Sequence, residues 1–443
     1  MLSSLAALGF SPSLQFLEET HHAAGTGLCD PNVKQISGYF KLTEKPERNY
    51  FFWFFESRGD PASDPVTLWM TGGPGCSSEV ALFGENGPCA VNAAGDNTTL
   101  NPYSWNAKSN LLYIDQPSGT GFSYPLSGTD AGEAGVARDM YDFLQQFFKA
   151  HSEYAKLPFF AFGESYAGHY IPAVTHKIWQ NNQALPAGAV HISLVGTSVG
   201  NGLTDPEIQY NYYKDMIVST NDHPAAVKPG GLVHKAMEAV TPKCIAAIKA
   251  CESSSAACAA ATDTCNLGLI EPYSATGLNP YDMRVKCEKP PLCYDFSNVA
   301  TYLKRPDVQA ALGVTGHKWS DCNHGVAIGF ELDGDWMQHY QQMIPDQLAA
   351  GIRVLIYAGD QDYICNWLGN QAWALALQWN HTADFNAAPV TNWTVAGKAA
   401  GELRSSNGFN FLRVFDAGHM VPRDQPANAQ AMLNAFLDGT LGR

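Results

Sequence analysis

The chain has 443 residues, of which 45% are apolar and 16% are charged, so it can bury a large core and is not disordered as a whole. Its formal net charge of −15 argues against nucleic acid or an anionic membrane as a partner. No window approaches the roughly 18 consecutive apolar residues of a transmembrane helix, so we expect no membrane span.

The N-terminal segment 1–27 is a poor signal peptide, because its first residues, MLSSLAALGF, are short and have no basic segment before them. We interpret residues 1–27 as the remnant of a pre/pro region or a disordered N-terminus, and we exclude them from the predicted fold.

The cysteines favour an oxidising compartment, since six of the eleven fall between Cys244 and Cys293. Three N-x-S/T sequons, which are candidate glycosylation sites, agree with passage through the secretory pathway: Asn97, Asn380 and Asn392.

Residues 28–204 alternate short apolar runs with helical stretches. The apolar runs predict buried strands at 66–70, 111–114, 159–162 and 192–195. Apolar residues at helical spacing predict a helix over 133–150. This alternation is typical of a mostly parallel sheet with helices on both faces.

Residues 205–341 are rich in cysteine and proline, and we interpret them as an insertion because the earlier pattern then resumes. Residues 342–443 contain predicted strands at 353–357 and 411–415 and a closing helix over 427–437. They therefore form the second part of the α/β core.

A serine follows one of the predicted strands at a sharp turn. The segment Gly163–Gly168 reads GESYAG and leads into a helical stretch, which predicts a nucleophile elbow that exposes Ser165 at the top of the sheet. The usual pattern is G-x-S-x-G, and its fifth position is Ala167 here, so the strand-to-helix context supports the assignment more than the motif does.

An acid and a histidine follow two later strands. The order Ser165, Asp362, His419 is the order of the α/β hydrolases, and each residue lies just past the carboxyl end of a strand. His419 would take the proton of the serine, and Asp362 would orient the imidazole. Asp360 is the alternative acid.

A glycine-rich loop, Thr71–Cys76, follows the strand at 66–70. Such a loop lets a backbone N–H approach a substrate oxygen, so we predict an oxyanion hole formed by the N–H groups of Gly73 and Tyr166.

These residues lie in strings that resemble the serine carboxypeptidase family from about Asp30 almost to the C-terminus. The strings are SGYFKL (37–42), LWMTGGPGCSS (68–78), NPYSWN (101–106), IDQPSGTGFSY (114–124), FGESYAGHYIPA (162–173), GNGLTDP (200–206), GDWM (334–337), YAGDQDYICNWLGN (357–370) and AGHMVPRDQP (417–426). The resemblance implies an α/β-hydrolase fold and a serine-type carboxypeptidase that acts through an acyl-enzyme.

The resemblance also implies a site for the substrate's terminal carboxylate, formed by Gly72, Glu85 and Glu164. Two close carboxyl groups cannot both stay ionised, so one keeps a proton that it can donate to the substrate, and we expect activity to be favoured at acidic pH. Thr71 stands where family members often carry Asn and is expected to contribute more weakly. The implied substrate pocket contains Trp69, Cys365 and Met420.

The family's disulfide pattern implies four pairs and leaves one more by elimination. The implied pairs are Cys244–Cys265, Cys251–Cys258, Cys287–Cys293 and Cys76–Cys322; Cys29–Cys89 remains, with Cys365 as the free thiol. Absence of a C-x-x-C pair argues against a metal site, and no cofactor is expected.

Two other functions stay open at this point. One is acyl transfer, although relatives with that activity typically carry Asp where this chain has Glu164. The other is a protective or scaffolding role. The expected partners are peptide or protein C-termini, together with a homodimer, and the expected location is the vacuole, the lysosome or the extracellular space.

Overall fold

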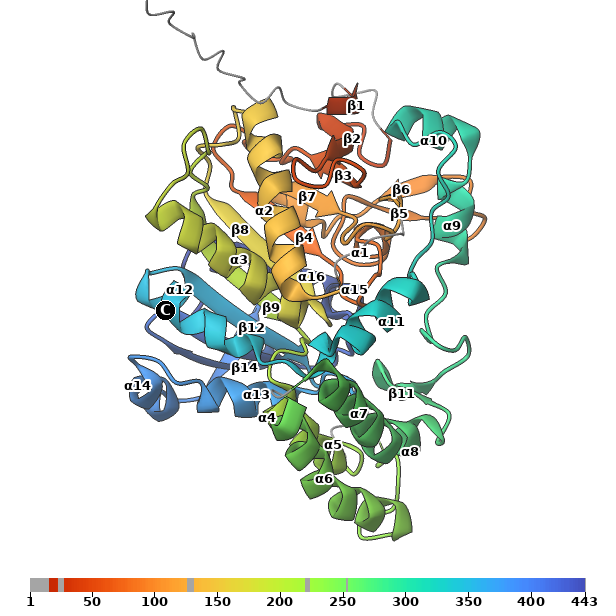
Figure 1. The fold of residues 1–443 in the computed structure, drawn as a ribbon, viewed down its shortest axis with the longest axis vertical. Helices are drawn as coiled ribbons and strands as arrows, with labels where there is room; N and C mark the ends of the chain where they lie inside the picture. The colour runs from red at the N-terminus through yellow and green to blue at the C-terminus, as the bar shows by residue number, and fades with distance from the viewer. Residues whose placement is uncertain (1–15, 23–27, 126–130, 220–223, 252–253, 443) are drawn as a thin grey trace, which may run out of the picture.

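The computed structural model describes residues 16–22, 28–125, 131–219, 224–251 and 254–442. Within them, an eleven-stranded sheet has the order β1-β2-β3-β7-β4-β8-β9-β12-β15-β14-β13 (Figure 1). The strands from β7 to β15 in this order are parallel, and antiparallel pairs extend both edges. The strands are β1 (Phe16–His22), β2 (Gln35–Lys41), β3 (Asn49–Phe55), β4 (Val66–Met70), β7 (Asn110–Ile114), β8 (Phe159–Glu164), β9 (Leu194–Gly200), β12 (Arg353–Gly359), β13 (Thr391–Val395), β14 (Lys398–Ser406) and β15 (Phe409–Val414).

Helices cover both faces of the sheet, and each face has its own apolar core. On one face lie α2 and α3, whose apolar residues pack with those of α12 (Figure 1). On the other lie α1 and α16. The helices of these layers are α1 (Glu79–Gly84), α2 (Glu133–Ala150), α3 (Ala167–Gln183), α12 (Ile344–Ala349), α13 (Trp367–Ala376), α14 (Thr382–Ala387), α15 (Val421–Asp424) and α16 (Pro426–Leu437). This topology is that of an α/β-hydrolase fold.

The predicted elements of the core are present with small shifts. Strand β4 and helix α2 have the predicted bounds, whereas β9 begins at Leu194, two residues later than expected. The delay has a local cause, because the Leu194 N–H donates to the carbonyl of Ile192 and turns the chain there.

Part of the N-terminal segment corrects our expectation. Residues 1–15 and 23–27 lie outside the described residues, but Phe16–His22 forms β1, which pairs antiparallel with β2. We had excluded this stretch from the fold, and it instead adds an edge strand to the sheet.

Between β9 and β12 the chain is mainly helical. Helices α4–α8 extend away from the sheet, and α9–α11 run along its side (Figure 1). They are α4 (Pro206–Gln209), α5 (Tyr213–Met216), α6 (Leu232–Cys251), α7 (Ser255–Cys265), α8 (Glu271–Ser274), α9 (Ser297–Leu303), α10 (Pro306–Leu312) and α11 (His324–Asp333), with the short strands β10 (Leu278–Asn279) and β11 (Asp282–Lys286). A second small hairpin, β5 (Cys89–Val91) with β6 (Thr98–Leu100), lies between α1 and β7.

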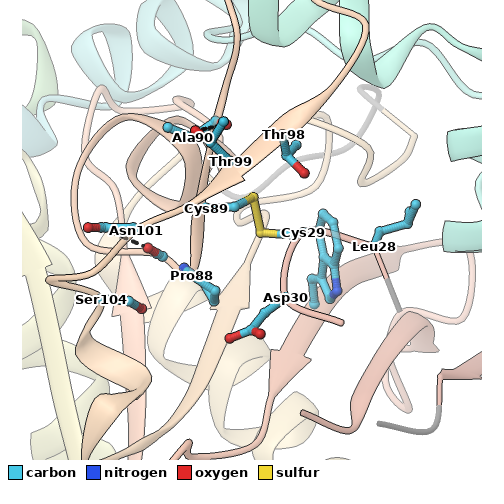
Figure 2. The surroundings of a disulfide bond; sticks show 12 residues. Leu28, Cys29, Asp30, Pro88, Cys89, Ala90, Thr98, Thr99, Asn101 and Ser104 are labelled. Atoms are coloured by element: carbon cyan, nitrogen blue, oxygen red, sulfur yellow. Dashed lines mark hydrogen bonds between the residues drawn. A yellow bond between two sulfur atoms is a disulfide. The ribbon is translucent and has the colours of Figure 1, made fainter. Parts of the chain in front are cut away.

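Five disulfides cross-link the fold, in the pairs that the sequence suggested: Cys29–Cys89, Cys76–Cys322, Cys244–Cys265, Cys251–Cys258 and Cys287–Cys293. Figure 2 shows the first, which ties the segment before β2 to β5. Beside it the buried Asp30 carboxylate accepts a hydrogen bond from Arg58 Nε at 2.7 Å. Cys365 is free and buried.

Candidate active site

Ser165 lies at the turn between β8 and α3, in a strained conformation. Its φ of +66° is rare for a residue with a side chain, and it directs the chain sharply from the strand into the helix. A Cβ at Gly163 would lie 2.6 Å from the Cβ of Ala167, so the turn requires glycine there. This geometry is that of a nucleophile elbow.

His419 and Asp362 meet at the carboxyl ends of β15 and β12. His419 Nδ1 is 2.8 Å from Asp362 Oδ2, and both side chains are buried. The carboxylate also accepts hydrogen bonds from Asn201 Nδ2 at 2.9 Å and from the backbone N–H groups of Ile364 and Cys365. Because Asp362 only accepts, the imidazole proton lies on Nδ1, which leaves Nε2 unprotonated and able to accept a proton.

Asp360, the alternative acid, has different partners. Its Oδ2 is 3.2 Å from Arg413 Nη2, and its Oδ1 accepts from the Asp416 N–H. The structure therefore brings Asp362, and not Asp360, against His419.

Two backbone N–H groups lie beside Ser165. Within the described part of the chain, neither the Gly73 N–H nor the Tyr166 N–H donates to a protein group. A Cβ at Gly72 would lie 2.4 Å from the Tyr166 nitrogen, so the two segments approach closely enough only because residue 72 is glycine. This pair of donors can stabilise a developing oxyanion.

A buried pair of carboxyl groups adjoins His419. Glu164 Oε1 is 4.0 Å from His419 Nε2, and Glu85, at the end of α1, faces Glu164. Burial raises the pKa of Glu85 to about 7, and burial together with the charge of Glu85 raises the pKa of Glu164 well above its usual range. The pair therefore retains a proton at acidic pH.

Thr71 lines the cleft, whereas Trp69 lies behind it. The Trp69 side chain is 1% exposed and donates its indole N–H to Thr71 Oγ1 at 3.0 Å. Trp69 thus orients Thr71 and packs edge-on against Trp105, and its part in the substrate pocket stays a prediction.

Two clefts meet at Ser165, and Gly73 and Tyr281 also border both. The cleft on the side of Glu164 has a volume of about 200 Å³ and contains Met420. Its remaining apolar lining comes mainly from Pro74, Val80, Pro291, Leu292, Tyr294, Phe296 and Ala327. The second cleft, of about 150 Å³, contains Cys365 and is lined mainly by Tyr166, Leu203, Tyr210, Tyr213, Ile270, Trp336 and Ile364.

Several residues of the candidate site were not predicted from the sequence. Asn201 was missed, although its place directly after β9 in the string GNGLTDP was a usable signal. Tyr281 and Tyr294 come from the insertion, where no pattern in the sequence points to the site.

The three sequon asparagines, Asn97, Asn380 and Asn392, are all exposed, as a glycosylation site must be. None of the helices in the ranges described above is long and apolar enough to cross a membrane.

The fold and the cleft together define the class of protein: an α/β hydrolase with a serine, a histidine and an acid at the carboxyl ends of its parallel strands. The family model described as serine carboxypeptidase matches residues 26–439. The chain therefore belongs to the serine carboxypeptidase family, and it is a serine-type carboxypeptidase.

Individual relatives agree with this assignment. The chain is 43% identical to carboxypeptidase Y of Candida albicans over 413 residues, which are 92% of this chain and 74% of that protein. It is 42% identical to carboxypeptidase Y of Komagataella phaffii, over 92% of this chain and 76% of that protein. The crystal structure of a prohormone-processing carboxypeptidase from Saccharomyces cerevisiae is similar with a TM-score of 0.82 at 25% identity, over 95% of each chain.

Proposed function

We propose that the enzyme removes the C-terminal amino acid from peptides and proteins through an acyl-enzyme on Ser165. His419 Nε2 takes the serine proton as Oγ attacks the last peptide bond, and then gives it to the leaving amine. Water activated by His419 hydrolyses the ester. The N–H groups of Gly73 and Tyr166 stabilise the oxyanion in both steps, so every step uses groups of the chain and water.

The observation that carries the proposal is the carboxyl pair beside His419. A hydrolase with Ser165 and His419 alone would have no preference for chain ends. Glu85 and Glu164, together with Thr71 and the backbone at Gly72, offer donors to a free carboxylate next to the scissile bond. This recognition restricts cleavage to the last residue.

Peptide binding is then favoured at acidic pH. The pKa of Glu85 is raised to about 7 and that of Glu164 well above its usual range, so both side chains are protonated under acidic conditions. Above about pH 7 the Glu85 carboxylate becomes negatively charged next to the substrate carboxylate and repels it. KM is thus lowest under acidic conditions.

The two clefts indicate the side chains that the enzyme prefers. The cleft that contains Glu164 receives the leaving residue, and the cleft that contains Cys365 receives the residue before it. Because both are lined mainly by aromatic and aliphatic side chains, we expect apolar residues to be preferred at both positions.

The five disulfides and the exposed sequons support a protein of the secretory pathway, in the vacuole, the lysosome or outside the cell. We expect a homodimer, and light scattering coupled to size-exclusion chromatography tests this expectation. A single species at the monomer mass would exclude it.

The test of this function is release of leucine from Z-Phe-Leu at pH 5 and pH 7, with Ser165→Ala as the control. We expect release that is faster at pH 5 and absent in the variant. Transfer of the acyl group from an activated ester, without leucine release, would instead support acyl transfer.

A further inference from the structure

One buried carboxylate of the insertion, that of Asp335, contacts the side chain of Tyr166, whose backbone N–H is a proposed oxyanion donor. Asp335, in the short helical turn Asp335–Met337 after α11, is 4% exposed. Its Oδ2 accepts a hydrogen bond from the phenol of Tyr166 at 2.6 Å, and His169 Nδ1 lies 3.2 Å from the same oxygen. Its Oδ1 accepts from the phenol of Tyr340 at 2.5 Å and from the Glu133 N–H at 3.2 Å.

These contacts fix Asp335 from three directions, because the donors come from α2, from α3 and from the segment after the turn. Both oxygens of the carboxylate have two hydrogen-bond partners, so the group anchors the segments that surround it.

The charge of this cluster resides on Asp335. Burial alone would raise the pKa of Asp335, but hydrogen bonds from His169, Tyr166 and Tyr340 lower it. Burial, and then the charge of Asp335, raise the pKa of the neighbouring Glu133 well above its usual range. Glu133 therefore keeps its proton and leaves Asp335 the single carboxylate; the facing atoms of Glu133, His169 and Asp335 lie within 4.8 Å of one another.

The side chain of Tyr166 is held along its whole length. The ring is 2% exposed and packs against His169, Tyr170 and Trp336, with ring centroids 4.5, 5.4 and 5.0 Å away. Its hydroxyl donates a hydrogen bond to Asp335. Since the Tyr166 N–H is one of the two proposed oxyanion donors, a shift of this side chain moves the donor.

We infer that Asp335 is a positioning residue, which holds the Tyr166 N–H in place for the transition state through the Tyr166 phenol. The inference rests on the proposed function, in which that N–H binds the oxyanion. The insertion thus contributes to catalysis as well as to substrate binding.

Two conservative variants test the inference: Tyr166→Phe, which removes only the hydroxyl, and Asp335→Asn, which removes the charge of the acceptor. We expect each to lower kcat for Z-Phe-Leu by roughly tenfold, less than the loss when an oxyanion donor is deleted outright, with KM unchanged. The double variant should be no slower than either single variant, because both remove the same contact.

A second readout separates positioning from general loosening of the structure. A peptidyl aldehyde forms a tetrahedral adduct with the serine and uses the oxyanion hole, whereas the product leucine has no group at the position of the scissile carbonyl and does not use it. We expect both variants to lose aldehyde affinity in proportion to kcat and to keep their affinity for leucine, measured as product inhibition. Equal losses for both ligands would contradict the inference.

Tyr154→Phe is the matched control, since Tyr154 is another buried tyrosine that donates to a carboxylate, Glu56, at 2.8 Å, outside the site. It should leave kcat and aldehyde affinity unchanged. If Ser165→Ala abolishes hydrolysis but Tyr166→Phe keeps the kcat of the parent enzyme, positioning by Asp335 is wrong and the proposed function stands. Retained hydrolysis in Ser165→Ala would overturn the proposed function itself.

Discussion

At the scale of single residues, the acid that supports His419 is distinguished by its hydrogen bonds. Asp362 accepts from Asn201 and from two backbone N–H groups, and it contacts His419 at 2.8 Å. Asp360 lies two residues away in the same loop but is paired with Arg413. The two aspartates are therefore a natural pair for comparison.

We predict that Asp362→Asn lowers kcat by about 10⁴-fold, because the amide would favour the wrong imidazole tautomer. Asp360→Asn breaks the contact with Arg413 and should lower thermal stability while kcat stays near that of the parent enzyme. Steady-state kinetics on Z-Phe-Leu and thermal melting measure both effects. Equal losses of kcat in the two variants would contradict the assignment of Asp362.

At the scale of elements, the glycine-rich loop Thr71–Cys76 after β4 is covalently linked to the insertion. The Cys76–Cys322 disulfide joins them, and the Asn323 N–H donates to the Gly75 carbonyl at 2.8 Å. Because Gly73 belongs to this loop, we expect the link to affect the proposed oxyanion hole as well as stability.

Replacing both Cys76 and Cys322 with serine should cost about 2–4 kcal/mol of stability and lower kcat several-fold. The matched control replaces Cys29 and Cys89, which form a disulfide and line neither cleft. It should lower the denaturation midpoint without changing kcat. If both double variants keep the kcat of the parent enzyme, the Cys76–Cys322 disulfide is not required to position the glycine loop for catalysis.

The helices and strands also show which parts of the fold and of the candidate site can be predicted from the sequence. The strand ends that carry Ser165, Asp362 and His419 were predictable, because apolar runs and the residues after them are local signals. Asn201 follows the end of β9 and had the same kind of local signal, although we missed it. Tyr294 and Asp335 act through contacts with residues far away in the chain, and no local pattern encodes such contacts.

At the scale of the whole molecule, buried carboxyl groups surround the site. Among the described residues, burial raises the pKa of six buried carboxyl groups: Glu79, Glu85, Asp115, Glu133, Glu164 and Asp360. A carboxyl group whose pKa is higher in the folded than in the unfolded state stabilises the folded state. This contribution is complete at pH values below the pKa of the unfolded state. That contribution is lost as the pH rises through the folded value.

We therefore predict that the melting temperature is highest near pH 5 and falls towards pH 8. The net charge of −15 adds repulsion in the same direction, but salt screens it, whereas buried groups are screened much less. The fall should persist in 0.5 M NaCl and become shallower in Glu79→Gln, while the exposed Glu271→Gln keeps the parent slope. A melting temperature that rises with pH would contradict the prediction.

We propose that protonation of Glu85 and Glu164 allows the enzyme to recognise the free carboxylate of its substrate. This is tested by KM between pH 5 and pH 8 for Z-Phe-Leu and for its C-terminal amide, Z-Phe-Leu-NH2. We predict that KM for the acid rises steeply as the pH passes about 7, while KM for the amide, which has no charge to repel, changes little. Parallel changes for the two substrates would contradict the claim.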